Sequence, residues 1–561
     1  MSRRAWCSWC WLAGLLLGGC GDDATPAADA DADVPGDAPT ETPTDAPTDS
    51  VDPAWYAPDP VGRRTENDLS ELDPEMLVIT PWELADAWQP YARHRTLSGI
   101  TTRVVTTDEV FAWAGGADEA DQVRNFLRER HFGGGLRFAL LGGDAELMPF
   151  RRVEASVTVP FSGTFTTNGP AELFFAELDA DWDADHDGRW GERNQDLTLE
   201  ELRQAELAVG RVPAGNAAEV ANFVGKVVVY EADANRRGGY PLFFSDLATT
   251  LALVGDVDGA EAMELTIADV FPPEFRDNAA RLYTTDEAVA TYGGETISAR
   301  RVAQRLLDGY PLSFHNGHGS HWNLANPLDG DWVRGLDNAM PTVLASCACL
   351  SGNFADVAND GTFDLWTEQE RDQDSAAELL ITGPCGAVGY VGNTAIGLGP
   401  VGGVQFLDAF YRAMFEEGLT RLGEAVNYGR AHIRDMNLVV RGVPMPISDE
   451  TEWFTLLEVL LLGDPALPMW TTSPRPIELT VPETYGPGWQ ELTVHVAEPG
   501  GIPAPGVTVV AHKDRDFTVR GTTDADGDVV FRFIPDGPAP IAVRATAPWF
   551  QPAEASIAPE L

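Results

Sequence analysis

Apolar and polar positions alternate through the middle of the chain in a rhythm of strands followed by helices. Short apolar runs predict strands at 76–80, 101–106, 138–142, 249–254, 312–315, 342–347 and 387–391. Apolar residues three and four positions apart predict helices at 82–95, 118–131, 260–270, 298–307, 404–416 and 422–433. This alternation is typical of a mainly parallel sheet with helices on both faces. The sequence therefore predicts an α/β fold of two side-by-side subdomains, 72–240 and 241–472.

The pattern changes to a period of two in the last part of the chain, 473–561. Alternating runs lie between turns rich in Gly, Pro and Asp, at 491–496, 507–511, 528–533 and 540–545. This pattern predicts an antiparallel β-sandwich. The segment 521–528, Gly-Thr-Thr-Asp-Ala-Asp-Gly-Asp, resembles a turn of the immunoglobulin-like modules of bacterial surface proteins, so we expect an immunoglobulin-like sandwich.

The first residues have the pattern of an export signal. Arg3 and Arg4 precede an apolar run that is too short to cross a bilayer but suits the core of a secretory signal. The run ends in Leu-Gly-Gly-Cys at Cys20, which resembles the lipobox of bacterial lipoproteins. We expect 1–19 to be removed and Cys20 to be lipidated, which would hold the exported protein at the outer membrane or cell surface. An ordinary secretory signal, and hence a secreted protein, is the alternative.

The segment that follows the signal, 20–71, is rich in Asp, Ala, Pro and Thr. It cannot bury enough apolar surface to fold, so we expect a disordered acidic tether that lifts the folded part off a membrane. The whole chain of 561 residues has a net charge of −49. Such a surface repels phosphate backbones, which argues against a nucleic-acid partner and favours divalent cations.

Few cysteines remain for chemistry after the signal and the lipidated position. They are Cys347, Cys349 and Cys385, and their odd number leaves at least one thiol unpaired in an exported protein. Cys349 ends a predicted strand and is followed by a glycine turn. Cys347 lies deeper in the same strand and is expected to be structural, and a disulfide between Cys347 and Cys385 stays open.

A glycine-rich segment ends the preceding strand, at 313–322. Its sequence is Ser-Phe-His-Asn-Gly-His-Gly-Ser-His-Trp, with glycines on both sides of His318. Active sites of open α/β sheets lie beyond the carboxyl ends of the strands, so His318 and Cys349 are expected to meet there. An imidazole supplies the base that a thiol nucleophile needs. His315, His318 and His321 also raise the question of zinc, but the glycines argue against a helix that would gather them.

Together these segments resemble the gingipain family of cysteine peptidases, within the caspase-like clan. The resemblance rests on Gly-His-Gly-Ser at 317–320, Cys-Leu-Ser-Gly-Asn-Phe at 349–354 and Glu-Leu-Ala-Val-Gly-Arg at 206–211. Weaker matches are Leu-Gly-Gly-Asp-Ala at 141–145, Gly-Tyr-Val-Gly-Asn at 389–393 and Leu-Gly-Asp-Pro at 462–465. Because all six occur in order, the resemblance implies a caspase/gingipain-like fold over 72–472.

The resemblance implies a cysteine endopeptidase that acts on protein or peptide substrates. Cys349 would attack the scissile carbonyl to form a thioester, and His318 would act as general acid and base. Glu206 would orient the imidazole, and the backbone amides of Gly319 and Cys349 would hold the oxyanion. No organic cofactor is expected.

An acidic loop at 179–192 indicates a cation site. Its carboxylates fall on alternate residues, which suits calcium, a hard cation that takes about six to eight oxygen ligands. The predicted Ca²⁺ ligands are Asp179, Asp181, Asp183, Asp185, Asp187 and Glu192. The loop departs from the EF-hand pattern in either register, because His186 replaces the glycine or Asn194 the final acid. Since calcium is structural in gingipains, the resemblance implies a stabilising role, and a solvated acidic hairpin is the alternative.

Two other functions stay open. A sortase-like transpeptidase would use the same His318 and Cys349 but resolve the acyl-enzyme with an amine instead of water. A non-catalytic, calcium-binding surface lipoprotein would bind a partner through the sandwich at 473–561. The glycine settings of Cys349 and His318 favour an enzyme, because a binding protein has no need to keep both.

Overall fold

The computed structural model describes residue 69 and residues 73–560, except 160–162, 233–239, 247, 252–254, 326–327, 356–373, 437 and 473. The predicted signal at 1–19, Cys20 and nearly all of the tether at 20–71 lie outside these residues. Of the helices in the described part, none is both long and apolar enough to cross a membrane.

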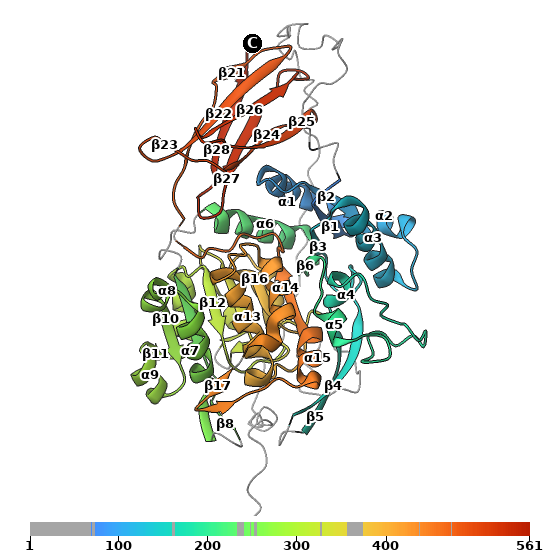
Figure 1. Cartoon of the computed structure of the whole chain (residues 1–561), viewed down its shortest axis with the longest axis vertical. Helices are drawn as coiled ribbons and strands as arrows, with labels where there is room; N and C mark the ends of the chain where they lie inside the picture. Colours follow the sequence, from blue (N-terminus) through green and yellow to red (C-terminus); the bar gives the residue numbers. More distant parts are fainter. Residues whose placement is uncertain are drawn as a thin grey trace, which may run out of the picture.

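A sheet of eleven strands forms the centre of the molecule (Figure 1). In spatial order the strands are β11 (Glu295–Thr296), β10 (Ala280–Tyr283), β7 (Pro241–Ser245), β12 (Leu312–His315), β15 (Thr342–Ser346), β16 (Ala387–Asn393), β19 (Val459–Gly463), β6 (Ala208–Val212), β3 (Phe138–Gly142), β1 (Met76–Thr80) and β2 (Thr102–Thr106). The central strands are buried on both faces, which explains their continuous apolar sequences. The predicted mainly parallel α/β fold is confirmed.

The two predicted halves share this sheet. Strands β2, β1, β3 and β6 come from 72–240, and the others come from 241–472. The halves join where β19, which runs antiparallel to β16, meets β6 at a single pair, Leu462 and Arg211. Apolar side chains from both halves belong to one buried core.

Fifteen helices and four short strand pairs surround the sheet in the described part. The helices are α1 (Ala85–Leu97), α2 (Thr107–Trp113), α3 (Glu119–Gly134), α4 (Leu173–Ala176), α5 (Leu199–Leu202), α6 (Ala217–Ala232), α7 (Gly259–Val270), α8 (Pro273–Asn278), α9 (Asp286–Tyr292), α10 (Ala299–Leu307), α11 (Gly330–Arg334), α12 (Ala376–Thr382), α13 (Gly403–Phe415), α14 (Leu422–His432) and α15 (Asp449–Glu458). The pairs are β4 (Arg152–Val159) with β5 (Gly163–Pro170), β8 (Ala248–Leu251) with β9 (Gly255–Asp258), β13 (Asn323–Ala325) with β14 (Leu328–Asp329) and β17 (Val439–Val440) with β18 (Val443–Pro444).

One strand that the sequence predicts for the main sheet lies outside it. Residues 249–254 were expected to enter the main sheet, but β8 pairs antiparallel with β9 in a separate two-stranded unit. The place in the main sheet is taken by β7, which lies between β10 and β12. A short run rich in Thr, Ala and Leu suits a hairpin as well as a buried strand, so the sequence pattern does not separate the two.

The last part of the chain forms two antiparallel-rich sheets with a core of their own, which is consistent with the predicted β-sandwich. One sheet contains β20 (Glu478–Thr480), β22 (Gln490–Glu498), β23 (Ile502–Pro503) and β26 (Asp528–Phe533). The other contains β21 (Thr484–Tyr485), β28 (Ala553–Pro559), β27 (Ile541–Thr546), β24 (Thr508–Lys513) and β25 (Phe517–Thr522). Figure 1 shows this unit at one end of the molecule, next to α1 and α6.

Buried charges join the sandwich to the α/β unit. Arg544 of β27 pairs with Glu231 of α6 at 3.2 Å, and Glu231 also pairs with Arg95 of α1 at 2.5 Å. Arg95 in turn contacts Asp464, in the turn after β19. Burial would raise the pKa of Glu231, but the charges of Arg95 and His94 outweigh burial and hold the pKa well below its ordinary value. Breaking a buried pair leaves an uncompensated charge, so this contact fixes the sandwich against the sheet.

Candidate active site

The loop after β12 presents His318 at the carboxyl edge of the sheet. His318 is half-buried, and its backbone N–H donates to Oδ1 of Asp246 at 3.0 Å. Asp246 follows β7, the strand next to β12. A side chain at Gly317 would collide with this carboxylate, since an added Cβ would lie 1.6 Å from Asp246 Oδ1. The glycine before His318 therefore lets the backbone close onto Asp246.

The loop after β15 presents Cys349 at the same edge. The thiol is half-buried and lies 3.8 Å from the carbonyl oxygen of Gly397. The next residue, Leu350, has a positive φ of 60° and donates its N–H to Ala395 at 2.7 Å. Gly352 donates to the carbonyl of Asn393, at the end of β16, at 3.0 Å. These bonds hold the cysteine loop against the neighbouring strand end.

The two loops touch at Gly319. An added Cβ there would lie 2.6 Å from Cβ of Ala348 and 2.7 Å from the carbonyl oxygen of Cys349. Only a glycine fits this gap, because real Cβ atoms do not approach other atoms so closely. The structure therefore brings the histidine loop and the cysteine loop together, from strands that pair side by side.

The Cys349 thiol is shielded from water and lies near a buried acid, Glu458. Burial, together with the nearby acid Glu458, raises the pKa of Cys349 to about 12. Glu458, at the end of α15, is 2% exposed, and neither of its carboxylate oxygens has a hydrogen-bond partner in the described part of the chain. Burial also raises the pKa of Glu458 well above its ordinary value. A resting thiol of this kind needs a base to become a nucleophile.

The other two cysteines are differently placed. Cys347 is buried, and its thiol donates to Oδ1 of Asn316 at 2.8 Å. Cys385 is half-buried, and Cys347, Cys349 and Cys385 are all free thiols. The disulfide between Cys347 and Cys385 that the sequence left open is therefore not formed. The thiol at the contact between the two loops is the half-buried Cys349.

Glu206 is not brought to this site. Its carboxylate accepts the N–H of Leu178 at 2.7 Å, and Glu206 precedes β6. The other end of β6 faces the cysteine loop, because the guanidinium of Arg211 lies 4.5 Å from the ring of Phe354. Glu206 and Arg211 are five positions apart along extended chain, about 16 Å at roughly 3.3 Å per residue. The expected role of Glu206 in orienting His318 does not fit this placement.

Asp246 is the acid that the sequence did not single out. It is 8% exposed and contacts both His318 and His315, the latter at 3.1 Å from Oδ1 to Nε2. The sequence does hold one feature that could have identified Asp246. The apolar run Leu-Phe-Phe at 242–244 just before it predicts a strand that ends at an acid.

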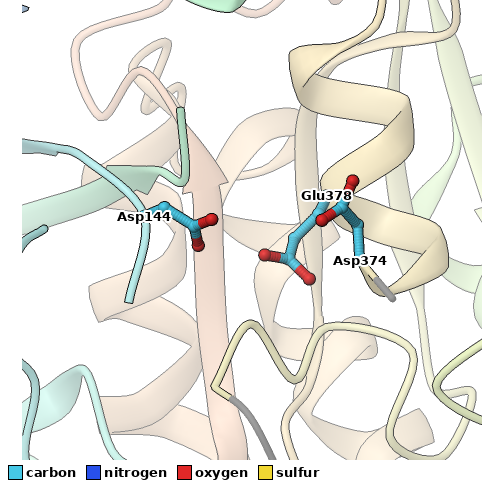
Figure 2. Close-up of side chains that lie close together, drawn as sticks. All are labelled: Asp144, Asp374 and Glu378. Carbon is cyan, nitrogen blue, oxygen red and sulfur yellow. The ribbon is translucent and has the colours of Figure 1, made fainter. Parts of the chain in front are cut away.

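Three carboxylates from both halves of the sheet gather near the cysteine loop (Figure 2). Asp144 follows β3, Glu378 lies in the first turn of α12 and Asp374 lies two residues before that helix, and one oxygen of each lies within 4.8 Å of the others. Burial, together with the charges of Glu146 and Asp374, raises the pKa of Asp144 to about 7. Burial and then Asp144 raise the pKa of Glu378 well above its ordinary value. Such a cluster needs either protons or a cation to relieve its repulsion.

The acidic loop gathers only part of the predicted calcium ligands. Oxygens of Asp183, Asp185 and Asp187 lie within 4.8 Å of one another, a donor set that fits a hard cation. Glu192 instead pairs with Arg189 at 2.6 Å. The remaining two predicted ligands, Asp179 and Asp181, are exposed and lie outside this group.

Comparison with known proteins gives one family and a consistent fold. The sequence matches the model of peptidase family C25 over residues 69–470. The structure is similar to that of the Arg-specific cysteine proteinase gingipain R (RGPB), with 14% identity, a TM-score of 0.62, and coverage of 87% of this chain and 98% of that chain. It is also similar to the complex of Porphyromonas gingivalis RgpB pro- and mature domains, with 15% identity, a TM-score of 0.59, and coverage of 86% and 100%. No curated protein gives a match.

The carboxylate cluster predicts a pH-dependent effect of Asp144→Asn. The folded state keeps the Asp144 proton up to about pH 7, whereas an unfolded chain releases it near pH 3.9. The folded state therefore binds more protons in this window, and the free energy of unfolding falls as the pH rises through it. Asn cannot ionise, so in EDTA at pH 8 the variant should melt about 2 °C or more above the wild type.

Thermal melts of both proteins from pH 4 to pH 8 check this effect. The difference in Tm should become small towards pH 4, where Asp144 is protonated in the folded state and only about half ionised in the unfolded chain. Equal melting temperatures at pH 8 would show that the carboxylate is not under repulsion.

Proposed function

The chain belongs to peptidase family C25 and is a cysteine-type peptidase, and we propose that it is an endopeptidase in which Cys349 is the nucleophile and His318 the general acid and base. The observation that carries this proposal is the contact at Gly319. The histidine loop and the cysteine loop meet there with no room for a side chain between them. The two reactive residues reach this edge from adjacent strands, β12 and β15.

The reaction follows from the state of the thiol. With a pKa raised to about 12 by burial, Cys349 is protonated at neutral pH. His318 takes the thiol proton as the sulfur attacks the scissile carbonyl, and then gives it to the leaving amine. The backbone N–H groups of Gly319 and Cys349 stabilise the oxyanion of the tetrahedral intermediate. Water, activated by His318, hydrolyses the thioester and releases the free thiol.

Asp246 replaces Glu206 as the acid that supports His318. Its Oδ1 accepts the backbone N–H of His318, so it fixes the loop that carries the imidazole. This support acts on the backbone of the loop, and Gly317 makes it possible by leaving space for the carboxylate.

Covalent labelling tests the pair directly. A panel of acyloxymethyl-ketone peptides should label the reduced protein at Cys349, because its loop meets the loop of His318 at the sheet edge. Cys349→Ala should abolish labelling and peptide cleavage, and His318→Ala should lower both by about a hundredfold or more.

Cys347→Ala serves as the matched control, since it removes a buried thiol two residues away. The Cys347→Ala variant should still be labelled at Cys349. An adduct that forms on Cys347, or that forms at full rate without His318, would contradict the proposed pair.

The substrate class follows from Glu458. This buried carboxyl is near Cys349 and has no partner in the described residues, a costly state for an acid. A lysine or arginine side chain of a substrate, next to the scissile bond, would supply the missing partner. The negative net charge of −49 would also favour basic substrates. We therefore propose cleavage beside a basic residue.

Substitution of Glu458 tests this preference. Glu458→Gln keeps the shape but cannot ionise beside a bound cation, so kcat/KM for peptides with Arg or Lys beside the cut should fall about tenfold or more. For matched peptides with a neutral residue at that position, kcat/KM should stay the same. If the ratio of kcat/KM for basic peptides to kcat/KM for neutral peptides is the same in Glu458→Gln as in the wild type, Glu458 is excluded as the recognition group.

Calcium remains a proposal for the acidic loop. Asp183, Asp185 and Asp187 would hold the ion, whose positive charge would relieve the repulsion among them and steady the loop. Calcium at a hundred times its Kd should stabilise the folded protein by about 2.7 kcal/mol relative to EDTA. Thermal melts check this rise, which Asp185→Asn should remove and Asp179→Asn should leave intact. A rise that persists in Asp185→Asn would place the ion elsewhere.

We also propose that Cys20 anchors the exported protein to the cell envelope. Export fits the signal-like start of the chain, and an acidic tether at 20–71 would give the peptidase reach from the membrane. The mass of the mature N-terminal peptide tests the anchor, because a peptide without lipid would leave only secretion.

A further inference from the structure

We propose that His315 is a positioning residue that couples the histidine loop to the cysteine loop, an inference that rests on the proposed function of Cys349 and His318. His315 ends β12 and is fully buried at 0% exposure. Its ring stacks on Phe244 of β7, with centroids 4.7 Å apart. Its ring face and both of its nitrogens are taken up by protein groups, so it acts through the groups that it holds.

The ring of His315 bridges two strands on either side of it. Nε2 lies 3.1 Å from Oδ1 of Asp246, after β7, and Nδ1 lies 2.8 Å from Oγ of Ser346, at the end of β15. A carboxylate can only accept, so Nε2 carries the proton and donates to Asp246. With a proton on Nε2, Nδ1 is placed to accept the hydroxyl proton of Ser346.

The chain of hydrogen bonds continues to the residue before the nucleophile. Oγ of Ser346 accepts the backbone N–H of Ala348 at 3.0 Å. The hydrogen bonds therefore run without a break from Ala348 through Ser346 and His315 to Asp246, and Tyr390 also hydrogen-bonds Ser346. Such a fully satisfied buried network holds its members in one geometry.

The same oxygen of Asp246 also accepts the N–H of His318. One carboxylate thus fixes the histidine loop directly, and fixes the cysteine loop through His315 and Ser346. The relative position of the two loops depends on this relay. Loss of the relay should misplace Cys349 against His318 without removing either group.

Four variants separate this role from ordinary stabilisation. His315→Phe keeps the aromatic stacking but removes both ring nitrogens, and Ser346→Ala removes the next link. Ser346→Thr keeps a hydroxyl on a residue that suits a strand. Ser313→Ala is the matched control, because Ser313 is equally buried on β12 and bonds Thr342 of β15 at 2.9 Å, outside the relay.

The readouts are kcat and KM per titrated active site, together with the rate of Cys349 alkylation by iodoacetamide. His315→Phe and Ser346→Ala should lower kcat and alkylation about tenfold or more, with KM little changed, because alignment of the pair is lost. Ser346→Thr should restore most of the rate. Ser313→Ala should lower Tm at most, with kcat within about twofold of the wild type.

The outcomes distinguish the inference from its premise. A wild-type protein that neither cleaves peptides nor labels at Cys349 would remove the proposed function itself. An active wild type whose kcat survives Ser346→Ala would leave the function standing and overturn the relay. If His315→Phe fails to fold, the comparison of Ser346→Ala with Ser346→Thr decides alone.

Discussion

One buried carboxylate oxygen, Oδ1 of Asp246, determines how the active edge of the sheet is built. It accepts the N–H of His318 and lies 3.1 Å from the ring of His315, so it holds one loop and reaches the other. A buried charge is stable only when it is paired or hydrogen-bonded, and the backbone of His318 and the ring of His315 supply those hydrogen bonds. Glycine at 317 is the consequence, because any side chain there would collide with the same oxygen.

Local pattern was sufficient for much of the fold. The strands at 76–80 and 138–142 end where expected, since each is a short apolar run with clear polar limits and is buried on both faces. The strand expected at 249–254 failed because a short apolar run suits a hairpin equally well. The joining of both halves in one sheet depends on β19 meeting β6, a long-range contact that no local pattern carries.

In the active site, too, some residues are marked by local sequence, whereas others are brought in only by long-range packing. Cys349 and His318 could be found because each follows a strand and has glycine neighbours, features that are local in sequence. Glu206 was chosen from a motif, but its strand presents the opposite end to the cysteine loop, through Arg211 and Phe354. Asp246 follows an apolar strand and Glu458 precedes one, but this common pattern does not mark either acid as part of the site, and only tertiary packing brings them close to the thiol.

A crystal structure of the protein trapped with a peptidyl acyloxymethyl ketone would test the account most directly. The account predicts a bond from the inhibitor to Sγ of Cys349, with the inhibitor oxygen about 2.7–3.1 Å from the N–H groups of Gly319 and Cys349. The His318 ring should face the sulfur, and the relay through Asp246, His315 and Ser346 should be intact. An adduct on another thiol, or an oxygen directed away from Gly319, would contradict it.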